Sequence, residues 1–351
     1  MVELSAPTRV SVVTVYYNRV QHIGGSIHSL LAQTCPNFEI VIVDDGSTDG
    51  TWEMLQSFAH LPNVRLLRQA NQGFTAALNN GVRASTGAYV AVHGSGDVSY
   101  PERLVKQAEV LDQREDVAVV GCVYDNSESH NANVQKWLTG LDPDLYRQLL
   151  RHDPFTHGCV MFRRELYDRV GGYREFFRFA QDRDFLLRLS DHGGYHILPE
   201  TLYRRNKPAD SVNNDFQKSL IQEYFADFAV QLAITRRSTS VDLLDKYGHA
   251  AAFLRRPSRR LGLRLVNSGV RWRVTWDDEA GWHYLRAARD EGLSLRSRLL
   301  LAVGSLPTNS WAWRKVVKPA LGEYLNFVSY RRAQRERALQ KLRLDADAQQ
   351  R

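Results

Sequence analysis

A short β-branched segment that ends in two carboxylates constrains the fold of this chain more than any other feature. Residues 40–43 read Ile-Val-Ile-Val, and Asp44-Asp45-Gly46-Ser47 follows at once. A continuous apolar run of this kind indicates a strand that is buried in a parallel sheet. Ligands of open α/β sheets bind beyond the carboxyl ends of the strands. The acidic pair is therefore predicted to face a ligand, and carboxylates suit the hydroxyl and N–H donors of a nucleoside better than its phosphates.

Strand and helix patterns alternate four times around this segment. Apolar or β-branched runs predict strands over residues 9–17, 40–43, 64–67 and 89–93, and later over 117–124. Apolar residues at helical spacing fill the intervals between these runs. This order predicts right-handed βαβ units, an α/β fold and a mostly parallel sheet flanked by helices.

Several of these segments resemble the motifs of family 2 glycosyltransferases. Residues 44–49 read Asp-Asp-Gly-Ser-Thr-Asp, and residues 71–89 are similar to the family's Asn-x-Gly…Asn-x-Gly…Gly-x-Tyr segment. Members of this family are inverting enzymes with the Rossmann-like GT-A fold. The resemblance covers residues 8–215. It implies a GT-A domain over residues 1–215, followed by a helical, basic C-terminal region over residues 216–351.

The resemblance also implies which residues hold the donor nucleotide. They lie at the ends of the first, second and fourth strands and at the start of the helix after Gly73. The expected donor contacts are Tyr16, Asn18, Asp44, Asp45, Gly73, Ser95 and Asp97.

One motif departs from the family pattern. The family has Asp-x-Asp-Asp where this chain has Gly94-Ser95-Gly96-Asp97, although the flank Pro101-Glu-Arg-Leu104 matches. The family carboxylates hold Mg²⁺ or Mn²⁺ through the oxygen ligands that hard cations require. Asn206 stands where the family has a His that faces the metal. The sequence therefore argues against a tight site for Mg²⁺ or Mn²⁺, and no metal ligand is predicted.

Three cations surround the altered His position. Arg204, Arg205 and Lys207 are predicted to neutralise the donor diphosphate in place of a divalent ion, because arginine offers bidentate contacts to phosphate.

The segment Ala180-Gln-Asp-Arg-Asp-Phe-Leu-Leu-Arg188 resembles the family's motif for the catalytic base. Asp182 matches the carboxylate that takes the proton of the attacking hydroxyl. Asp184 and Arg188, four residues apart on one helix face, are expected to support it. The start of a helix tends to lower a carboxylate pKa, which predicts an ionised base. His157 is expected on the acceptor side.

Charge divides the chain into two parts. Lys and Arg outnumber Asp and Glu by 21 to 9 from Ala251 onward, whereas the acidic residues prevail by 30 to 25 before it. The basic part, with interleaved Trp residues and a basic stretch over 330–343, fits either a solvated helix face or contact with an anionic membrane surface. No nucleic-acid recognition motif occurs. Three scattered cysteines, no signal peptide and no apolar run of membrane-spanning length favour a cytoplasmic protein.

These features predict an inverting transferase. It would move a UDP- or dTDP-linked sugar to a hydroxyl of a glycan or lipid-linked glycan, with little or no metal dependence. The resemblance places such chains in bacterial surface-polysaccharide assembly, such as O-antigen or capsule, as peripheral proteins on the inner face of the cytoplasmic membrane. Two alternatives stay open: a non-catalytic protein that binds glycan or scaffolds a partner, and a transferase that holds metal in another geometry.

Overall fold

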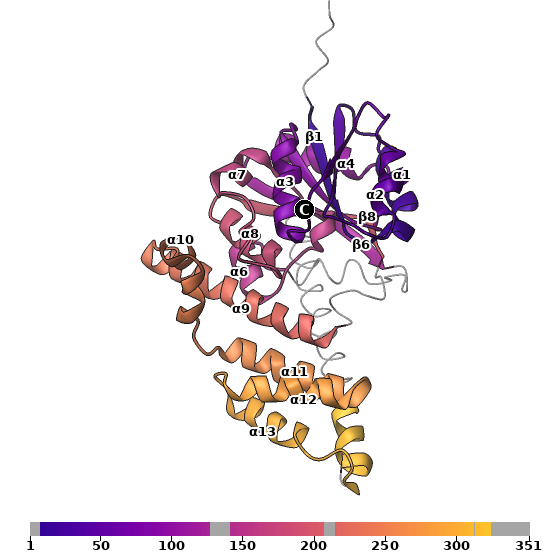
Figure 1. Cartoon of the computed structure of the whole chain (residues 1–351). Coiled ribbons are helices and arrows are strands. Elements are labelled where there is room, and N and C mark those ends of the chain that lie inside the picture. Colours follow the sequence, from indigo (N-terminus) through magenta and orange to yellow (C-terminus); the bar gives the residue numbers. More distant parts are fainter. Residues whose placement is uncertain (1–7, 127–140, 207–214, 312, 324–351) are drawn as a thin grey trace, which may run out of the picture. The chain divides into compact units, whose positions relative to one another are not determined.

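The structure is a computed structural model and describes residues 8–126, 141–206, 215–311 and 313–323. The chain forms two compact units, Met1–Pro208 and Ala209–Arg351. Figure 1 shows strands and helices in the first unit and helices in the second. The predicted boundary after residue 215 lies slightly later in the chain than the division between these two units, and it stays a prediction. Within the described residues, no helix has the length and apolar character needed to cross a membrane.

In the described part of the first unit, eight strands form one sheet in the order β3-β2-β1-β4-β7-β6-β8-β5. One half of the sheet is parallel and contains β1 (Val10–Tyr16), β2 (Phe38–Asp44), β3 (Val64–Arg68) and β4 (Tyr89–Gly94). These four strands confirm the strands predicted from the β-branched runs. The register pairs Tyr16 with Asp44 and Val15 with Gly94, so the carboxyl ends of β2, β1 and β4 meet at one edge.

The other half of the sheet is mixed. It contains β5 (Val98–Ser99), β6 (Val117–Asn126), β7 (Met161–Arg163) and β8 (Gly194–Arg205). Strand β7 runs antiparallel to both β4 and β6, whereas β8 is parallel to β6 and antiparallel to β5. The α/β class is thereby confirmed, with a sheet more mixed than predicted. The β5–β8 pairing brings the turn after β4 to the carboxyl end of β8.

Helices connect and cover the strands, as Figure 1 shows. They are α1 (Ile23–Leu31), α2 (Thr51–Gln56), α3 (Phe74–Ala84), α4 (Arg103–Gln113), α6 (Leu145–Arg151), α7 (Arg164–Arg169) and α8 (Gln181–Leu189). Helix α3 lies against β1 and β2. A Cβ on its Gly81 would stand 2.5 Å from Val13 Cγ1, so this close approach of helix to sheet requires glycine.

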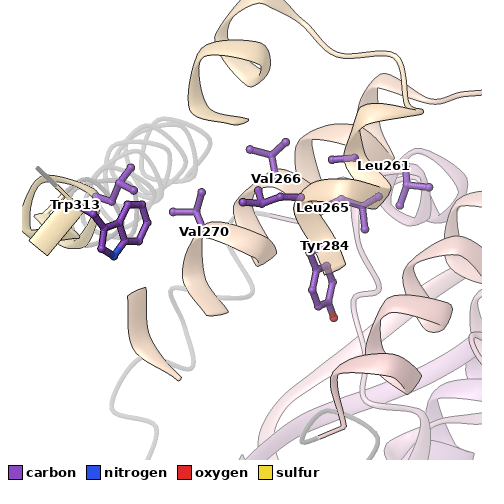
Figure 2. Packing of buried hydrophobic residues seen from close by; sticks show 9 residues of the cluster. Leu261, Leu265, Val266, Val270, Tyr284 and Trp313 are labelled. Carbon is purple, nitrogen blue, oxygen red and sulfur yellow. The ribbon is translucent and has the colours of Figure 1, made fainter. Parts of the chain in front are cut away.

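The second unit is helical, as predicted. Its described helices include α9 (Phe216–Thr239), α10 (Leu243–Tyr247), α11 (Arg259–Thr275), α12 (Asp278–Arg289) and α13 (Leu295–Gly304), followed by a π-helical turn (Trp313–Val317). Leu261, Leu265 and Val270 line the buried face of α11, and Figure 2 shows them with Tyr284 and Trp313 in one hydrophobic cluster. Tyr284 belongs to α12, so burial of this hydrophobic cluster holds α11 and α12 together.

Candidate active site

Asp44 and Asp45 end β2 as predicted, but their side chains have different surroundings. Both are buried. Asp44 Oδ2 accepts a hydrogen bond from the Ser47 N–H and lies 3.4 Å from Arg68 Nε. Asp44 Oδ1 is buried and has no hydrogen-bond partner among the described residues. A buried acceptor without a partner is costly, so this oxygen is well placed to receive an N–H or O–H of a ligand.

Asp45, in contrast, holds the neighbouring loop. Its Oδ1 accepts from Gln69 Nε2 and from the Gln72 N–H, and its Oδ2 accepts from the Gly73 N–H at 2.9 Å. Both oxygens are therefore engaged by the chain itself. Gly73 has φ +91°, and no atom lies within 4 Å of the position that a Cβ on this residue would take. The start of α3 is therefore open, as a ligand-facing glycine requires.

The predicted contact between Tyr16 and the donor nucleotide is wrong as far as the side chain of Tyr16 is concerned. Tyr16 is fully buried, and its hydroxyl donates to Ser26 Oγ at 3.0 Å. Ser26 Oγ also accepts from the Gly96 N–H and contacts His93 Nε2. Tyr16 is thus part of the floor beneath the site, because β1 is buried along its whole length. The neighbouring Tyr17 is 48% exposed.

Asn18 joins the loops after β1 and β2. Its N–H donates to Ser47 Oγ, and its side-chain carbonyl accepts from the Thr48 N–H at 2.8 Å. Its φ of +50° lies in the left-handed region that asparagine tolerates better than most residues. Asn18 therefore shapes the Asp-Asp-Gly-Ser loop at the predicted donor position.

Asp97 lies in the turn after β4 and is fixed by the end of β8. Its Oδ2 accepts a 2.5 Å hydrogen bond from the Tyr203 hydroxyl, and its Oδ1 accepts from the Asn206 N–H at 2.9 Å. Burial raises the pKa of Asp97 to about 6, although these hydrogen bonds and the charges of Arg205 and Arg103 counteract the rise. Ser95 is part-exposed in the same turn.

The two glycines of this turn cannot be replaced by the family's aspartates without rearrangement. A Cβ on Gly94 would stand 2.4 Å from Asp97 Oδ2, and a Cβ on Gly96 would stand 2.9 Å from His22 Cβ. Gly96 also has φ +91°, which strains any other residue. Asn206, in the predicted His position, donates its amide to the Gly96 carbonyl at 2.6 Å.

The residues of this turn do not fit the divalent ion that the family pattern implies. Asp97 is the remaining carboxylate of the motif, and both of its oxygens accept hydrogen bonds from the chain. In the described ranges, no group of three or more His, Cys, Asp or Glu side chains could hold a metal ion. Asn206 supplies its N–H to Asp97 rather than an oxygen to a cation.

The predicted diphosphate cations fall on different faces of β8. Arg204 contacts Asp125 and donates to the Tyr100 hydroxyl at 2.8 Å, so its charge is already matched. Arg205 lies on the same face of the strand as Tyr203, because side chains two residues apart point the same way. Within residues 8–126 and 141–206, its guanidinium has no hydrogen-bonded or ion-paired partner. Lys207 lies outside the described residues.

Asp182 is the second residue of α8 and follows a strained N-cap. The residue at the N-cap, Ala180, has φ +54°, and strain of this kind concentrates at functional sites. Burial raises the pKa of Asp182, and the N–H and charge of Arg183, with the charge of Arg205, offset only part of the rise. The lowered pKa expected from the helix start is therefore wrong, because desolvation outweighs the helix end. A raised pKa suits a general base.

Asp184 is locked in an ion-pair cluster. Its carboxylate pairs with Arg174 and with Arg188, whose Nε lies 3.0 Å from Asp184 Oδ2. Burial pushes the pKa of Asp184 upward, but the charges of Arg188 and Arg174 together outweigh it and hold the pKa below its usual range. Arg188 also donates to the Val170 and Gly172 carbonyls, which ties α8 to the Gly-Gly-Tyr turn.

His157 sits among aromatic side chains. Its Nε2 lies 2.9 Å from the Tyr173 hydroxyl, and its ring contacts Phe74 edge to face. Burial lowers the pKa of His157 to about 4, so the ring is neutral at physiological pH. Phe74 follows Gly73 at the start of α3 and is 38% exposed. The structure thus links the predicted acceptor residue to the open helix start.

Three side chains around the site were missed from the sequence. Tyr203 binds Asp97, Arg174 binds Asp184, and the buried Arg103 donates to Ser99 Oγ and the Val92 carbonyl beneath the turn. Arg103 belongs to the matching Pro-Glu-Arg-Leu motif, and Tyr203 alternates with Arg205. Both signals were present in the sequence.

This chain is similar to known proteins in sequence and in fold. The sequence profile described as Glycosyl transferase family 2 matches residues 11–171. EpsE of Bacillus subtilis (strain 168), assigned as a glycosyltransferase, is 31% identical over 218 residues, which cover 59% of this chain and 76% of EpsE. The chain belongs to glycosyltransferase family 2. This glycosyltransferase is also 30% identical to a chondroitin synthase of Escherichia coli over 58% of its own length but only 30% of that protein.

A solved structure supports the fold of this glycosyltransferase. The mannosyltransferase PcManGT from Pyrobaculum calidifontis, in complex with GDP-Man and Mn²⁺, superimposes with a TM-score of 0.52. The likeness covers 91% of this chain and 87% of PcManGT at 20% identity. The predicted GT-A fold is confirmed.

Proposed function

We propose that this glycosyltransferase moves a sugar from a UDP- or dTDP-linked donor to a hydroxyl of a glycan or lipid-linked glycan, with inversion at the anomeric carbon. A nucleotide-sugar donor is supported by the GDP-Man bound to PcManGT, which shares the fold. A glycan acceptor is supported by the chondroitin synthase among its relatives. The observation that carries the proposal is the part-exposed Asp182, whose pKa burial raises and the charge of Arg205 lowers, while Arg205 has no hydrogen-bonded or ion-paired partner among the described residues.

Asp182 acts as the general base. The acceptor oxygen forms a bond to the anomeric carbon while its proton passes to the Asp182 carboxylate. The bond from the anomeric carbon to the diphosphate oxygen breaks on the opposite face, and the nucleoside diphosphate leaves with the electron pair. Asp184, fixed by Arg174 and Arg188, positions α8 and does not touch the substrate.

Arg205 receives the diphosphate. Burial raises the pKa of both Asp97 and Asp182, and the charge of Arg205 counteracts the rise at both, which supports a role for this guanidinium in the site. A leaving diphosphate bound there would meet a positive charge whose hydrogen-bond donors are not used by any residue that the structure describes. Arg204 is the weaker candidate because Asp125 already balances its charge. Asp44 Oδ1 takes a donor of the nucleoside.

The biological setting of the proposal is surface-polysaccharide assembly, such as O-antigen or capsule. A lipid-linked acceptor would place the protein at the inner face of the cytoplasmic membrane as a peripheral protein. A non-catalytic, glycan-binding role is the second candidate, and the absence of the family's two aspartates at Gly94 and Gly96 favours it.

Slow hydrolysis of donors separates the two roles. We would incubate the purified protein with UDP-glucose, UDP-N-acetylglucosamine and dTDP-rhamnose and measure release of the nucleoside diphosphate, with water as the acceptor. Release that falls 100-fold or more in Asp182→Asn, but not in the exposed Asp168→Asn of α7, supports the enzyme, because a general base contributes roughly 10²- to 10⁴-fold. Equal release by wild type and Asp182→Asn would remove Asp182 as the base.

A further inference from the structure

Helix α13 is apolar on more than one side. Leu300 and Leu301 pack against the hydrophobic cluster of the second unit. Leu295, Leu299 and Val303 repeat every fourth residue on another stripe and are 76%, 61% and 40% exposed. Helices that are apolar all round are normally buried. The exposed stripe therefore calls for a partner that the described residues do not supply.

The stripe continues beyond the helix. Leu306 and Val316 are 39% and 53% exposed, and an apolar groove of about 370 Å³ lies between Leu299 and Val303 of α13 and Val316. We call Leu295, Leu299, Val303, Leu306 and Val316 the apolar face. Trp311, in the same segment, is 73% exposed. Exposed apolar side chains gathered along a groove, as Leu299, Val303 and Val316 are, mark an interaction site.

This apolar face is held in place by the core of its own unit. The Arg273 guanidinium donates to the Gly304 and Leu306 carbonyls at the end of α13. It also lies 4.3 Å from the Trp313 ring centroid and 4.5 Å from that of Trp282. Figure 2 shows Trp313 beside Val270 at the end of the buried row. The face is therefore a fixed surface rather than a fraying helix end.

The charges on the segment that carries the face are of one sign. Between Gly292 and Gly322 the sequence has no Asp or Glu, and Arg298, Arg314, Lys315 and Lys318 are exposed. A second copy would bring the same positive charge against it. Residues 324–351 carry more Lys and Arg than Asp and Glu, so they offer no complementary charge either. An apolar stripe flanked by cations is complementary to the headgroup region of an anionic bilayer.

We propose that the apolar face docks on the anionic surface of a lipid bilayer. Leu295, Leu299 and Val303 enter the boundary between headgroups and acyl chains, while Lys315 and Lys318 contact the phosphates. Trp311 sits at the headgroup level, where Trp is favoured. The proposed function includes a setting at the membrane, and the apolar face is the surface that would contact it. Docking of this face does not depend on the chemistry at Asp182.

The test is sedimentation of the full chain with vesicles. Vesicles of phosphatidylcholine alone are compared with vesicles that contain phosphatidylglycerol. We expect binding to the anionic vesicles, weak binding to the neutral ones, and a loss of binding as salt rises. Failure to bind anionic vesicles at low salt would overturn the proposal and leave the donor hydrolysis test unaffected.

Matched variants locate the surface. Leu299→Glu should lower the affinity for anionic vesicles at least tenfold, whereas Phe253→Glu, at an apolar residue that is 91% exposed outside the face, should change little. Lys315→Gln with Lys318→Gln should cost about fivefold per charge, since each Lys near an anionic membrane contributes roughly 1 kcal/mol. Lys246→Gln on α10 is the charge control.

Two other outcomes would contradict the proposal. Leu299→Glu that abolishes a dimer in analytical ultracentrifugation without affecting vesicle binding would assign the face to a second copy. Leu299→Glu that lowers the melting temperature but leaves vesicle binding intact would assign it to a segment of this chain. Circular dichroism of each variant shows whether the fold is kept.

Discussion

The Tyr203 hydroxyl donates a 2.5 Å hydrogen bond to Asp97 Oδ2 and so joins β8 to the turn after β4. The same hydroxyl accepts from the Gly94 N–H at 3.0 Å. A Cβ on Gly158 would stand 2.2 Å from it, so three segments close around this one oxygen. The turn where the family holds its metal is here built as a hydrogen-bonded unit.

Tyr203→Phe tests this unit. The variant leaves Asp97 buried without one of its two donors, which should lower the free energy of unfolding by about 1–3 kcal/mol at pH 8 and raise the Asp97 pKa further. Urea denaturation and NMR titration measure the two effects. Tyr89→Phe, which removes a hydrogen bond to Asp112 outside the site, should leave the Asp97 pKa unchanged.

The pH dependence of stability tests the buried Asp97. Its pKa is about 6 in the folded chain, against about 3.9 when unfolded, so the folded state binds more protons between these values. Stability therefore falls as pH rises through this window, by roughly 3 kcal/mol at 1.36 kcal/mol per unit. Asp97→Asn removes this loss. The free energy of unfolding of Asp97→Asn minus that of wild type should therefore increase from pH 3.5 to pH 7. If this difference does not change with pH, Asp97 titrates normally.

Restoring the family aspartate tests the packing of the turn. Gly94→Asp must displace Asp97 or Tyr203, so we expect a loss of stability of several kcal/mol and no gain of Mn²⁺ binding, measured by thermal melting and calorimetry. Gly24→Ala in α1, where nothing lies within 4 Å of the added Cβ, should instead stabilise by about 0.5–1 kcal/mol. A Gly94→Asp variant that folds and binds Mn²⁺ tightly would contradict this view of the turn.

The pH profile of transfer tests the base. Asp182 accepts a proton when ionised, and its raised pKa means that kcat/KM should begin to fall on acidification at a higher pH than an ordinary aspartate would give. The profile of Asp97→Asn should keep this acid limb, because the limb belongs to Asp182. An acid limb that disappears in Asp97→Asn would assign it to Asp97 instead.

Local patterns predicted much of this site. The β-branched run before Asp44, the open Gly73 and the position of Asp182 at a helix start are features of short segments, and the structure has them where expected. The different faces of Arg204 and Arg205 also follow from strand alternation, once Tyr203 is known to point inward. The contact between Tyr203 and Asp97 joins residues far apart in the sequence, so the sequence alone did not reveal it.

Other features depend on segments far apart in the sequence. Asp44 and Asp45 look equivalent in the motif, but the Gln69 side chain and the Gly73 N–H bind the carboxylate of Asp45 and not that of Asp44. The short β7 could not be given a direction, because its pairing with β4 and β6 is non-local. The pKa of Asp182 was predicted with the wrong sign because burial, which outweighs the helix end, comes from the whole fold.

The C-terminal unit shows the same limit. Trp311 and Trp313 look alike in the basic segment, yet Trp311 is 73% exposed while Trp313 is 2% exposed beneath Arg273. The sequence therefore suggested a membrane surface without showing which side chains form it. The basic stretch over 330–343 lies outside the described residues.

The central claim is that Arg205, rather than a divalent ion, meets the donor diphosphate. Calorimetric titration with UDP and with dTDP, once in EDTA and once in Mn²⁺, tests it most directly. We predict equal binding in both conditions and a loss of roughly tenfold or more in Arg205→Gln, the scale of a hydrogen bond to a charged group, with little loss in the neighbouring Arg204→Gln. Binding that requires Mn²⁺, or that is weakened by Arg204→Gln and not by Arg205→Gln, would contradict the claim.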